Sequence, residues 1–238
     1  MAISSIATAP SAAAKNKPVF WEILWQSAGI QAVVLFVIAD LIYGRQPQAG
    51  ASAEALIAFY TGSETRILIA AAITGIAVLN LLWFAAAVRV TLADAGKDGW
   101  GAAATASSAA FGGLLLLITA VGATLANSAT SAQNPMLASG LNDLSWALLV
   151  LASFPRAMLM MSMAFGLWRA RLISNSLFSV GVAFVVLGVL GGTTWTSSGY
   201  WALDGAYARF ISPSLLLAWV LVVSWVLLTR RPVARVGW

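Results

Sequence analysis

Six long stretches of nearly continuous apolar residues dominate the pattern of hydrophobic and polar positions along this chain. Each is close to the roughly 20 residues that a helix needs to cross the hydrocarbon layer of a bilayer. A transmembrane β-barrel would instead show short segments of alternating hydrophobicity, so continuous runs favour helices. The pattern predicts an all-α, polytopic membrane helix bundle with transmembrane helices at residues 20–43, 66–90, 102–126, 143–168, 174–194 and 210–229.

The first connection is long, and it contains an amphipathic segment. In SAEALIAFY, which begins at Ser52, the serine can cap a helix and several large apolar side chains can share one side. We therefore expect a short interfacial helix in the first external loop. The amino-terminal residues are small and polar and lack the apolar block of a signal peptide. The predicted organisation is a disordered cytoplasmic tail at residues 1–18, a six-helix transmembrane domain at residues 19–230 and a second cytoplasmic tail at residues 231–238.

Composition supports the membrane assignment and excludes several chemistries. Hydrophobic residues make up 61% of the chain and charged residues 9%, against roughly 45–50% and 25% in a soluble domain. The chain has no Cys and no His, which excludes disulfides, haem ligation by His and most transition-metal sites. Since no Ser–His or Cys–His nucleophile can form either, we expect no cofactor and no metal, and an enzyme is disfavoured.

Basic residues indicate the orientation. With the amino terminus in the cytoplasm, nine Lys and Arg residues fall inside, three fall outside (Arg45, Arg66 and Arg209) and Arg156 falls within the membrane. This bias predicts that both termini are cytoplasmic. The formal charge of +5 then reflects orientation and contact with anionic lipids, not binding to nucleic acid. We therefore expect a multi-pass protein of the cell membrane with lipids as partners.

Arg156 is predicted to lie deep in the bilayer. It precedes the inner end of its span by 12 residues, which places it about 18 Å deep. Because an unpaired arginine at the bilayer centre costs at least about 2.5–3.5 kcal/mol, we expect its guanidinium to face the bundle interior. Pro155 beside it removes a helical hydrogen bond and frees a carbonyl one turn earlier, near Leu151.

Two amides are predicted at a similar depth, Gln31 in the first span and Asn80 in the second. Both can offer an oxygen to a guanidinium. We therefore predict a central polar cluster of Gln31, Asn80 and Arg156, with Ser153 and Ser162 near it. One interpretation is a binding site for an anion, a carboxylate or a headgroup. The other is a structural polar clamp between helices.

A second candidate cluster lies at the outer boundary and contains Asp40, Arg66, Asn142 and Asp143. Asn142 and Asp143 precede an apolar run, so they can simply cap the fourth span. Asp40 either pairs with Arg66 or Arg45, or it forms a proton or cation site.

Gly188 and Gly192 have the small-xxx-small spacing that permits close helix approach, either within one chain or in a homo-oligomer. The methionines between residues 158 and 163 are interpreted as gap fillers in helix interfaces and not as metal ligands.

The segments FYTGSETRILIA and LNDLSWALLVLASFP, together with the six-span order, resemble a group of uncharacterised integral membrane proteins. This group is frequent in actinobacteria and lies close to the DUF4386-type families. The resemblance extends from about the first span to the last. It implies a bacterial six-helix membrane protein, and it implies no particular activity.

Three functional hypotheses follow. The first is a non-catalytic membrane protein that binds or translocates a small amphiphilic or anionic molecule within the helix bundle. The second is a structural or regulatory subunit that acts through helix contacts with itself or a partner. The third, and the least supported, is an intramembrane enzyme that uses Asp40 or Asp143.

Overall fold

The computed structural model describes residues 24, 25, 27–128 and 135–229, and these ranges contain helices and no strands. The predicted tails at residues 1–18 and 231–238 lie outside the described residues and stay predictions. The elements are α2 (Ala28–Tyr43), α3 (Ala53–Gly62), α4 (Glu64–Asp94), α5 (Asp98–Ser128), α6 (Pro135–Leu151), α7 (Ser153–Arg169), α8 (Asn175–Leu190), η2 (Gly191–Thr193), η3 (Tyr207–Ile211) and α9 (Ser212–Thr229).

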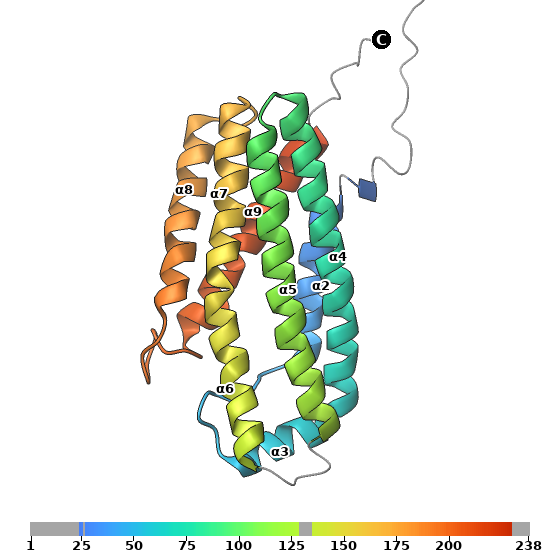
Figure 1. Ribbon diagram of the computed structural model, residues 1–238, viewed down its shortest axis with the longest axis vertical. Helices are drawn as coiled ribbons and strands as arrows, with labels where there is room; N and C mark the ends of the chain where they lie inside the picture. The colour runs from blue at the N-terminus through green and yellow to red at the C-terminus, as the bar shows by residue number, and fades with distance from the viewer. Residues whose placement is uncertain (1–23, 26, 129–134, 230–238) are drawn as a thin grey trace, which may run out of the picture.

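The long helices run side by side along one axis, as Figure 1 shows. Helices α2, α4 and α5 form one side of the bundle, and α7, α8 and α9 form the other. The short helix α3 crosses one end of the bundle, which we name the α3 end; the opposite end carries the α7–α8 turn. Helix α6 reaches the α3 end, whereas α8 stops well before it (Figure 1). The bundle is therefore thinner towards the α3 end.

Five helical segments are long and apolar enough to cross a membrane: Glu64–Asp94, Asp98–Asn127, Met136–Arg169, Asn175–Thr193 and Tyr207–Thr229. They coincide with the last five predicted spans and support a multi-pass membrane bundle. The first predicted span is represented by α2, an apolar helix of 16 residues. Residues 20–23 and 26 of that predicted span lie outside the described part of the chain, so the count of six spans stays a prediction.

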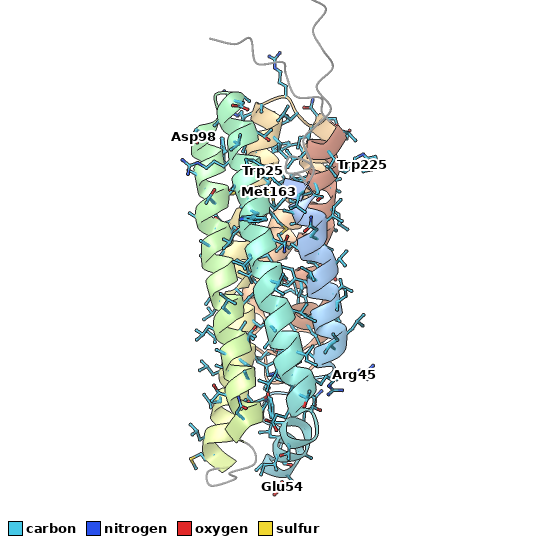
Figure 2. The ribbon with its side chains drawn as sticks, turned by 90° about the vertical axis from the view of Figure 1, so that its right-hand side faces the viewer. Trp25, Arg45, Glu54, Asp98, Met163 and Trp225 are labelled. Carbon is cyan, nitrogen blue, oxygen red and sulfur yellow. The ribbon has the colours of Figure 1, made fainter. Side chains whose placement is uncertain are left out.

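The outside of the bundle is apolar. Large side chains such as Leu79, Trp83 and Trp225 are 59–68% exposed, and Trp225 points away from the helices in Figure 2. Charged residues such as Asp98 and Glu54 lie at the two ends (Figure 2). Monomeric soluble proteins rarely expose such large continuous apolar surfaces, whereas the hydrocarbon region of a bilayer accommodates them. The surface therefore agrees with the hydropathy of the helices.

The helix that carries Arg156 is interrupted, and a proline explains the position. Helices α6 and α7 are separated at Ala152, which lies three residues before Pro155. Proline has no N–H to donate to the carbonyl of Leu151, and its ring crowds that turn. A second proline acts in the same way at the start of α9. Just before Pro213, the N–H of Ser212 donates to the carbonyl of Tyr207 in a π-helical turn.

The predicted packing glycines lie against helices of the same chain. A Cβ atom on Gly188 would lie 2.7 Å from Cε of Met160, and one on Gly192 would lie 2.5 Å from Cζ of Phe154. Both glycines therefore bring the end of α8 close to α7. A homo-oligomer stays a prediction, but these two positions already serve contacts within the chain.

A helix forms at the predicted amphipathic segment. The hydroxyl of Ser52 caps α3 by accepting from the N–H of Ala55 at 3.3 Å. Leu56 and Tyr60 are each 1% exposed, and they belong to a small apolar core that includes Ile67 of α4 and Leu125 of α5. The buried side of α3 thus packs on the bundle; its interfacial location stays a prediction.

Candidate functional site: a buried arginine in the helix bundle

Arg156 faces the interior of the bundle and is only 1% exposed. This burial confirms the prediction that its guanidinium faces the interior of the bundle and not the lipid. Its Nη2 atom donates to the hydroxyl of Ser153 at 2.6 Å and to the hydroxyl of Ser212 at 2.8 Å. Its guanidinium carbon lies 5.9 Å from the centre of the Phe111 ring. Helices α5, α7 and α9 therefore meet at this side chain.

The predicted amide partners of Arg156 are bonded elsewhere. Gln31 donates to the hydroxyl of Ser27 at 2.8 Å and to the carbonyl of Leu24 at 3.3 Å. Asn80 donates to the carbonyl of Ile76 in its own helix at 2.9 Å. Among the hydrogen bonds of the described residues, none joins either amide to Arg156. Depth alone is an insufficient criterion, because a side chain at the right level can point towards another side of its helix.

Two serines take the place of the amides. Ser153 precedes Arg156 by three residues, so it lies on the same side of the helix. Ser162, which was also expected near the arginine, instead donates to the carbonyl of Met158 at 2.7 Å. Ser212 was not anticipated, although its position beside Pro213 in an apolar span was a signal for irregular backbone. Its pairing with α7 depends on tertiary packing.

Gly191 creates the space for the two serines. A Cβ atom at this position would collide with Oγ of Ser212 and would lie 3.0 Å from Oγ of Ser153. The two hydroxyl oxygens lie 3.5 Å apart, and both face the guanidinium. The absence of a side chain on Gly191 therefore helps α7, α9 and the end of α8 to approach one another.

The charge of the site is unbalanced. In the described part of the chain, no carboxylate forms a salt bridge with Arg156, and both hydrogen bonds of its guanidinium come from Nη2. Its Nε atom is buried and has no hydrogen-bond partner. Tyr207, the first residue of η3, donates to the carbonyl of Leu187 at 2.7 Å and not to an anion. The guanidinium is thus a buried cation whose hydrogen-bond partners are neutral hydroxyl groups.

Phe154 precedes Arg156 by two residues and therefore lies on nearly the opposite side of α7, towards the outside of the bundle. This residue is 46% exposed, and its ring lies against Gly192. It therefore covers the contact between α7 and η2, two residues before Arg156. Apolar side chains on the same exposed side of the helix, Leu151 and Met158, are also partly open.

The predicted outer cluster divides into separate groups. Asn142 is fully buried; its side-chain oxygen accepts from Gln46 and from the hydroxyl of Tyr60, both at 3.2 Å. Its side-chain nitrogen donates to the carbonyl of Gln48 at 3.0 Å. Asn142 therefore ties α6 to α3 and to the loop before α3. We name Asn142, Gln46, Gln48 and Tyr60 the Asn142 cluster.

The other members of the outer cluster lie around this group or apart from it. Asp143 accepts from the backbone N–H of Gly50 at 2.9 Å. Nη2 of Arg66 donates to the hydroxyl of Ser63 at 2.8 Å, and the guanidinium carbon of Arg66 lies 5.8 Å from the centre of the Phe59 ring. Asp40 is exposed near the end of α2, and no salt bridge between described residues includes it. A role for Asp40 in proton or cation binding stays a prediction.

Metal chemistry has no support in the described residues, which contain no group of three or more His, Cys, Asp or Glu side chains that could hold a metal ion. Comparison with protein-family models, with curated proteins and with solved structures finds no match to the chain.

Proposed function

We propose that this chain is a multi-pass membrane protein that binds a small amphiphilic molecule with an anionic head, and that the head contacts Arg156. The observation that carries this proposal is the buried guanidinium on neutral partners, with an unpaired Nε. The predicted cluster is thereby revised: Ser153 and Ser212 take the place of Gln31 and Asn80 as the partners of the arginine.

The energetics of the Arg156 site favour a bound ligand over a purely structural role. Two hydroxyl groups offer partial negative charge, but they do not neutralise a cation. A buried N–H without a partner costs about 1–3 kcal/mol, and this cost adds to that of the buried charge. A carboxylate or phosphate oxygen would accept a hydrogen bond from Nε and supply the missing negative charge. The planar guanidinium can bind either group through two parallel hydrogen bonds.

The exposed side of α7 near Arg156 is apolar, which favours an amphiphilic ligand. Phe154, Leu151 and Met158 are apolar and exposed on the lipid side. A molecule with an acyl or other apolar tail could keep that tail in lipid while its head reaches the guanidinium. Because Arg156 is only 1% exposed, a ligand reaches its guanidinium only if the helices or side chains around it move.

The test compares ligand stabilisation in detergent. Decanoate should raise the melting temperature of the wild-type protein, whereas decanol should not, because only the acid carries a charge at neutral pH. Arg156→Met should abolish the decanoate effect, and Arg45→Met, which removes a charge at an exposed position, should preserve it. A decanoate effect that persists in Arg156→Met would contradict the proposal.

A structural clamp is the second candidate, because Nη2 of Arg156 bridges serines on α7 and α9. If this is its whole role, wild-type protein will respond equally to decanoate and decanol, and Arg156→Met will only change the melting temperature of the unliganded protein. Native mass spectrometry from mild detergent would add a direct view of molecules retained by the wild-type chain.

We further propose that the chain has six spans in a cell membrane with both termini in the cytoplasm, and that it is related to the DUF4386-like families. Supporting this, Lys97, Arg169 and Arg171 lie in the turns at the end where α2 begins and α9 ends. Since the chain has no Cys, single cysteines can report the orientation. Ser198→Cys should react with an impermeant thiol reagent in intact cells, and Ala95→Cys should not; the reverse labelling would invert the topology.

A further inference from the structure

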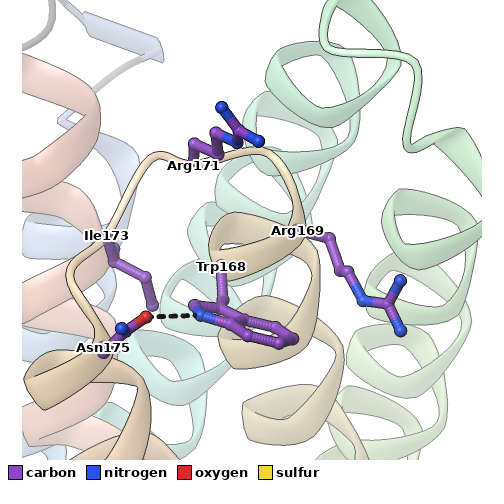
Figure 3. A pocket seen from close by; sticks show the side chains of 5 residues that line it. All are labelled: Trp168, Arg169, Arg171, Ile173 and Asn175. Carbon is purple, nitrogen blue, oxygen red and sulfur yellow. Dashed lines mark hydrogen bonds between the residues drawn. The ribbon is translucent and has the colours of Figure 1, made fainter.

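We propose that the α7–α8 turn binds the phosphate group of an anionic phospholipid. The site consists of Trp168, Arg169, Arg171, Ile173 and Asn175, which line an open cavity of about 450 Å³. Figure 3 shows the indole of Trp168 inside this turn, with Arg171 above it and Arg169 beside it. This inference depends on the membrane character of the chain and not on ligand binding at Arg156.

The aromatic base of the site is held in place. The indole N–H of Trp168 donates to the side-chain oxygen of Asn175 at 2.9 Å (Figure 3). The same ring stacks on Phe178 with centroids 4.5 Å apart. Trp168 therefore joins the end of α7 to the first turn of α8. Tryptophan is enriched at the headgroup level of membranes because its ring is apolar and its N–H is polar.

The two arginines are exposed and free of carboxylates. Arg169 lies 5.6 Å from the centre of the Trp168 ring, and among the described residues neither Arg169 nor Arg171 forms a salt bridge. The neighbouring α4–α5 turn differs, because there Arg89 pairs with Asp98 at 3.3 Å. Two uncompensated guanidinium groups beside one cavity favour an anion with several oxygens, such as a phosphate.

Arg171 occupies a backbone conformation that usually belongs to glycine. Its φ angle is 56°, the only positive value on a non-glycine residue in the described ranges. The turn is fixed by the bond from the Arg171 N–H to the carbonyl of Trp168 at 2.9 Å and by that from the Leu172 N–H to the carbonyl of Leu167 at 2.8 Å. These two bonds form a Schellman motif, in which the residue after the helix cap takes a left-handed conformation, so glycine should fit this position at least as well as arginine.

The position of the turn selects a lipid as the source of the phosphate. It joins two of the membrane-crossing segments, so it lies where headgroups are expected. Exposed apolar residues of α8, such as Val180, continue the surface towards the hydrocarbon. A bound phospholipid can thus place its phosphate between the arginines while its acyl chains lie along α8.

Native mass spectrometry in mild detergent tests this site with phosphatidylglycerol, phosphatidylcholine and inorganic phosphate as probes. Wild-type protein should retain phosphatidylglycerol in preference to phosphatidylcholine. Arg171→Gly should reduce this retention about five-fold, and Arg169→Gln/Arg171→Gly about 25-fold, given the usual attraction of one basic residue to an anionic surface. Because glycine relieves the positive φ of residue 171, the single variant is expected to fold.

The matched control is Arg45→Gln/Arg66→Gln, which removes the same two charges at the α3 end and should retain phosphatidylglycerol as the wild type does. Equal loss in the control would show a general charge effect and would overturn the proposal. Equal retention of the two lipids by the wild type would also overturn it. If inorganic phosphate displaces phosphatidylglycerol at comparable concentration, the site recognises free phosphate and the lipid assignment is wrong.

Discussion

Two buried polar groups lie on the same interrupted helix, Asn142 in α6 and Arg156 in α7, and their surroundings differ. Asn142 uses both its oxygen and its nitrogen in hydrogen bonds to α3 and the preceding loop. Arg156 shares one nitrogen between two serines and leaves Nε without a partner. Buried polar groups in native proteins are nearly always satisfied, so an exception calls for an explanation.

This difference separates a structural role from a binding role. The Asn142 cluster needs nothing from outside the chain, because its donors and acceptors match each other. Among the described residues no carboxylate pairs with Arg156, and its buried Nε has no hydrogen-bond partner. We infer that Asn142 stabilises the α3 end, whereas Arg156 accepts a ligand at some cost in stability.

The largest expected effect on stability is that of Asn142→Ala. The change leaves Gln46, Tyr60 and the carbonyl of Gln48 without their buried partner, and it should lower the free energy of unfolding by about 3 kcal/mol. Equilibrium unfolding in detergent measures this value. Asn80→Ala is the matched control and should change it by less than about 0.5 kcal/mol, since Asn80 bonds only within its own helix. Equal effects would remove the structural contrast.

The second prediction concerns the partners of Arg156. Ser153→Ala/Ser212→Ala removes both hydrogen bonds of a buried cation and should lower the free energy of unfolding by about 2 kcal/mol. Arg156→Met should change it by less than about 1 kcal/mol, because it removes the charge along with its bonds. Thermal melting of both variants provides the comparison. If Arg156→Met lowers the stability more than Ser153→Ala/Ser212→Ala does, the guanidinium is a net stabiliser of the fold. That outcome would favour a structural clamp over a binding site.

The sequence predicted the architecture better than the contacts. Continuous apolar runs predicted six membrane-spanning helices, and the described residues contain five helical segments that are long and apolar enough to cross a membrane, because lipid imposes one simple length and polarity rule. The same reasoning placed Arg156 inside the bundle, since a lipid-facing guanidinium is costly. Its partners could not be deduced in full, because they depend on which sides of α7 and α9 meet. Only Ser153, at helical spacing from the arginine, was within reach of sequence reasoning.

Asn142 illustrates the same limit at the other end of the bundle. An asparagine before an apolar run is most simply a helix cap, yet Asn142 lies within α6 and bonds to residues almost 100 positions away. Gln46 and Tyr60 gave no local signal of this contact. Arg66 and Asp40 do not belong to the Asn142 cluster, because both lie on exposed surfaces of their helices. Tertiary packing, and not local pattern, selected the members.

A third prediction sharpens the role of space at the Arg156 site. Gly191→Ala should push Ser212 away from the arginine, because the added Cβ would occupy the position of the hydroxyl. We expect the free energy of unfolding to fall by about 1 kcal/mol, together with a weaker response to decanoate. Gly75→Ala in α4 is the control, since nothing lies within 4 Å of its added Cβ. It should be neutral or slightly stabilising in the same unfolding measurement, and a matching loss there would exclude a specific effect.

The smallest expected effect belongs to Tyr60→Phe, and it depends on pH. The variant loses one of two hydrogen bonds to the oxygen of Asn142, but Gln46 retains the other. At neutral pH we therefore expect a loss of only about 0.5 kcal/mol in the free energy of unfolding. Unfolding measured across a series of pH values would detect the more informative change at high pH.

Burial raises the pKa of Tyr60 above its ordinary value, with a smaller contribution from Tyr43. Above about pH 10, the unfolded chain releases this phenolic proton while the folded chain keeps it, so the folded state becomes less stable as the pH rises. Up to about 1.4 kcal/mol per pH unit should be lost from this one group in the wild type. Tyr60→Phe removes that contribution, so its stability should converge on the wild-type value at high pH. Parallel curves for the two proteins would mean that the Tyr60 hydroxyl is hydrated, and that the Asn142 cluster is less sealed than its hydrogen bonds imply.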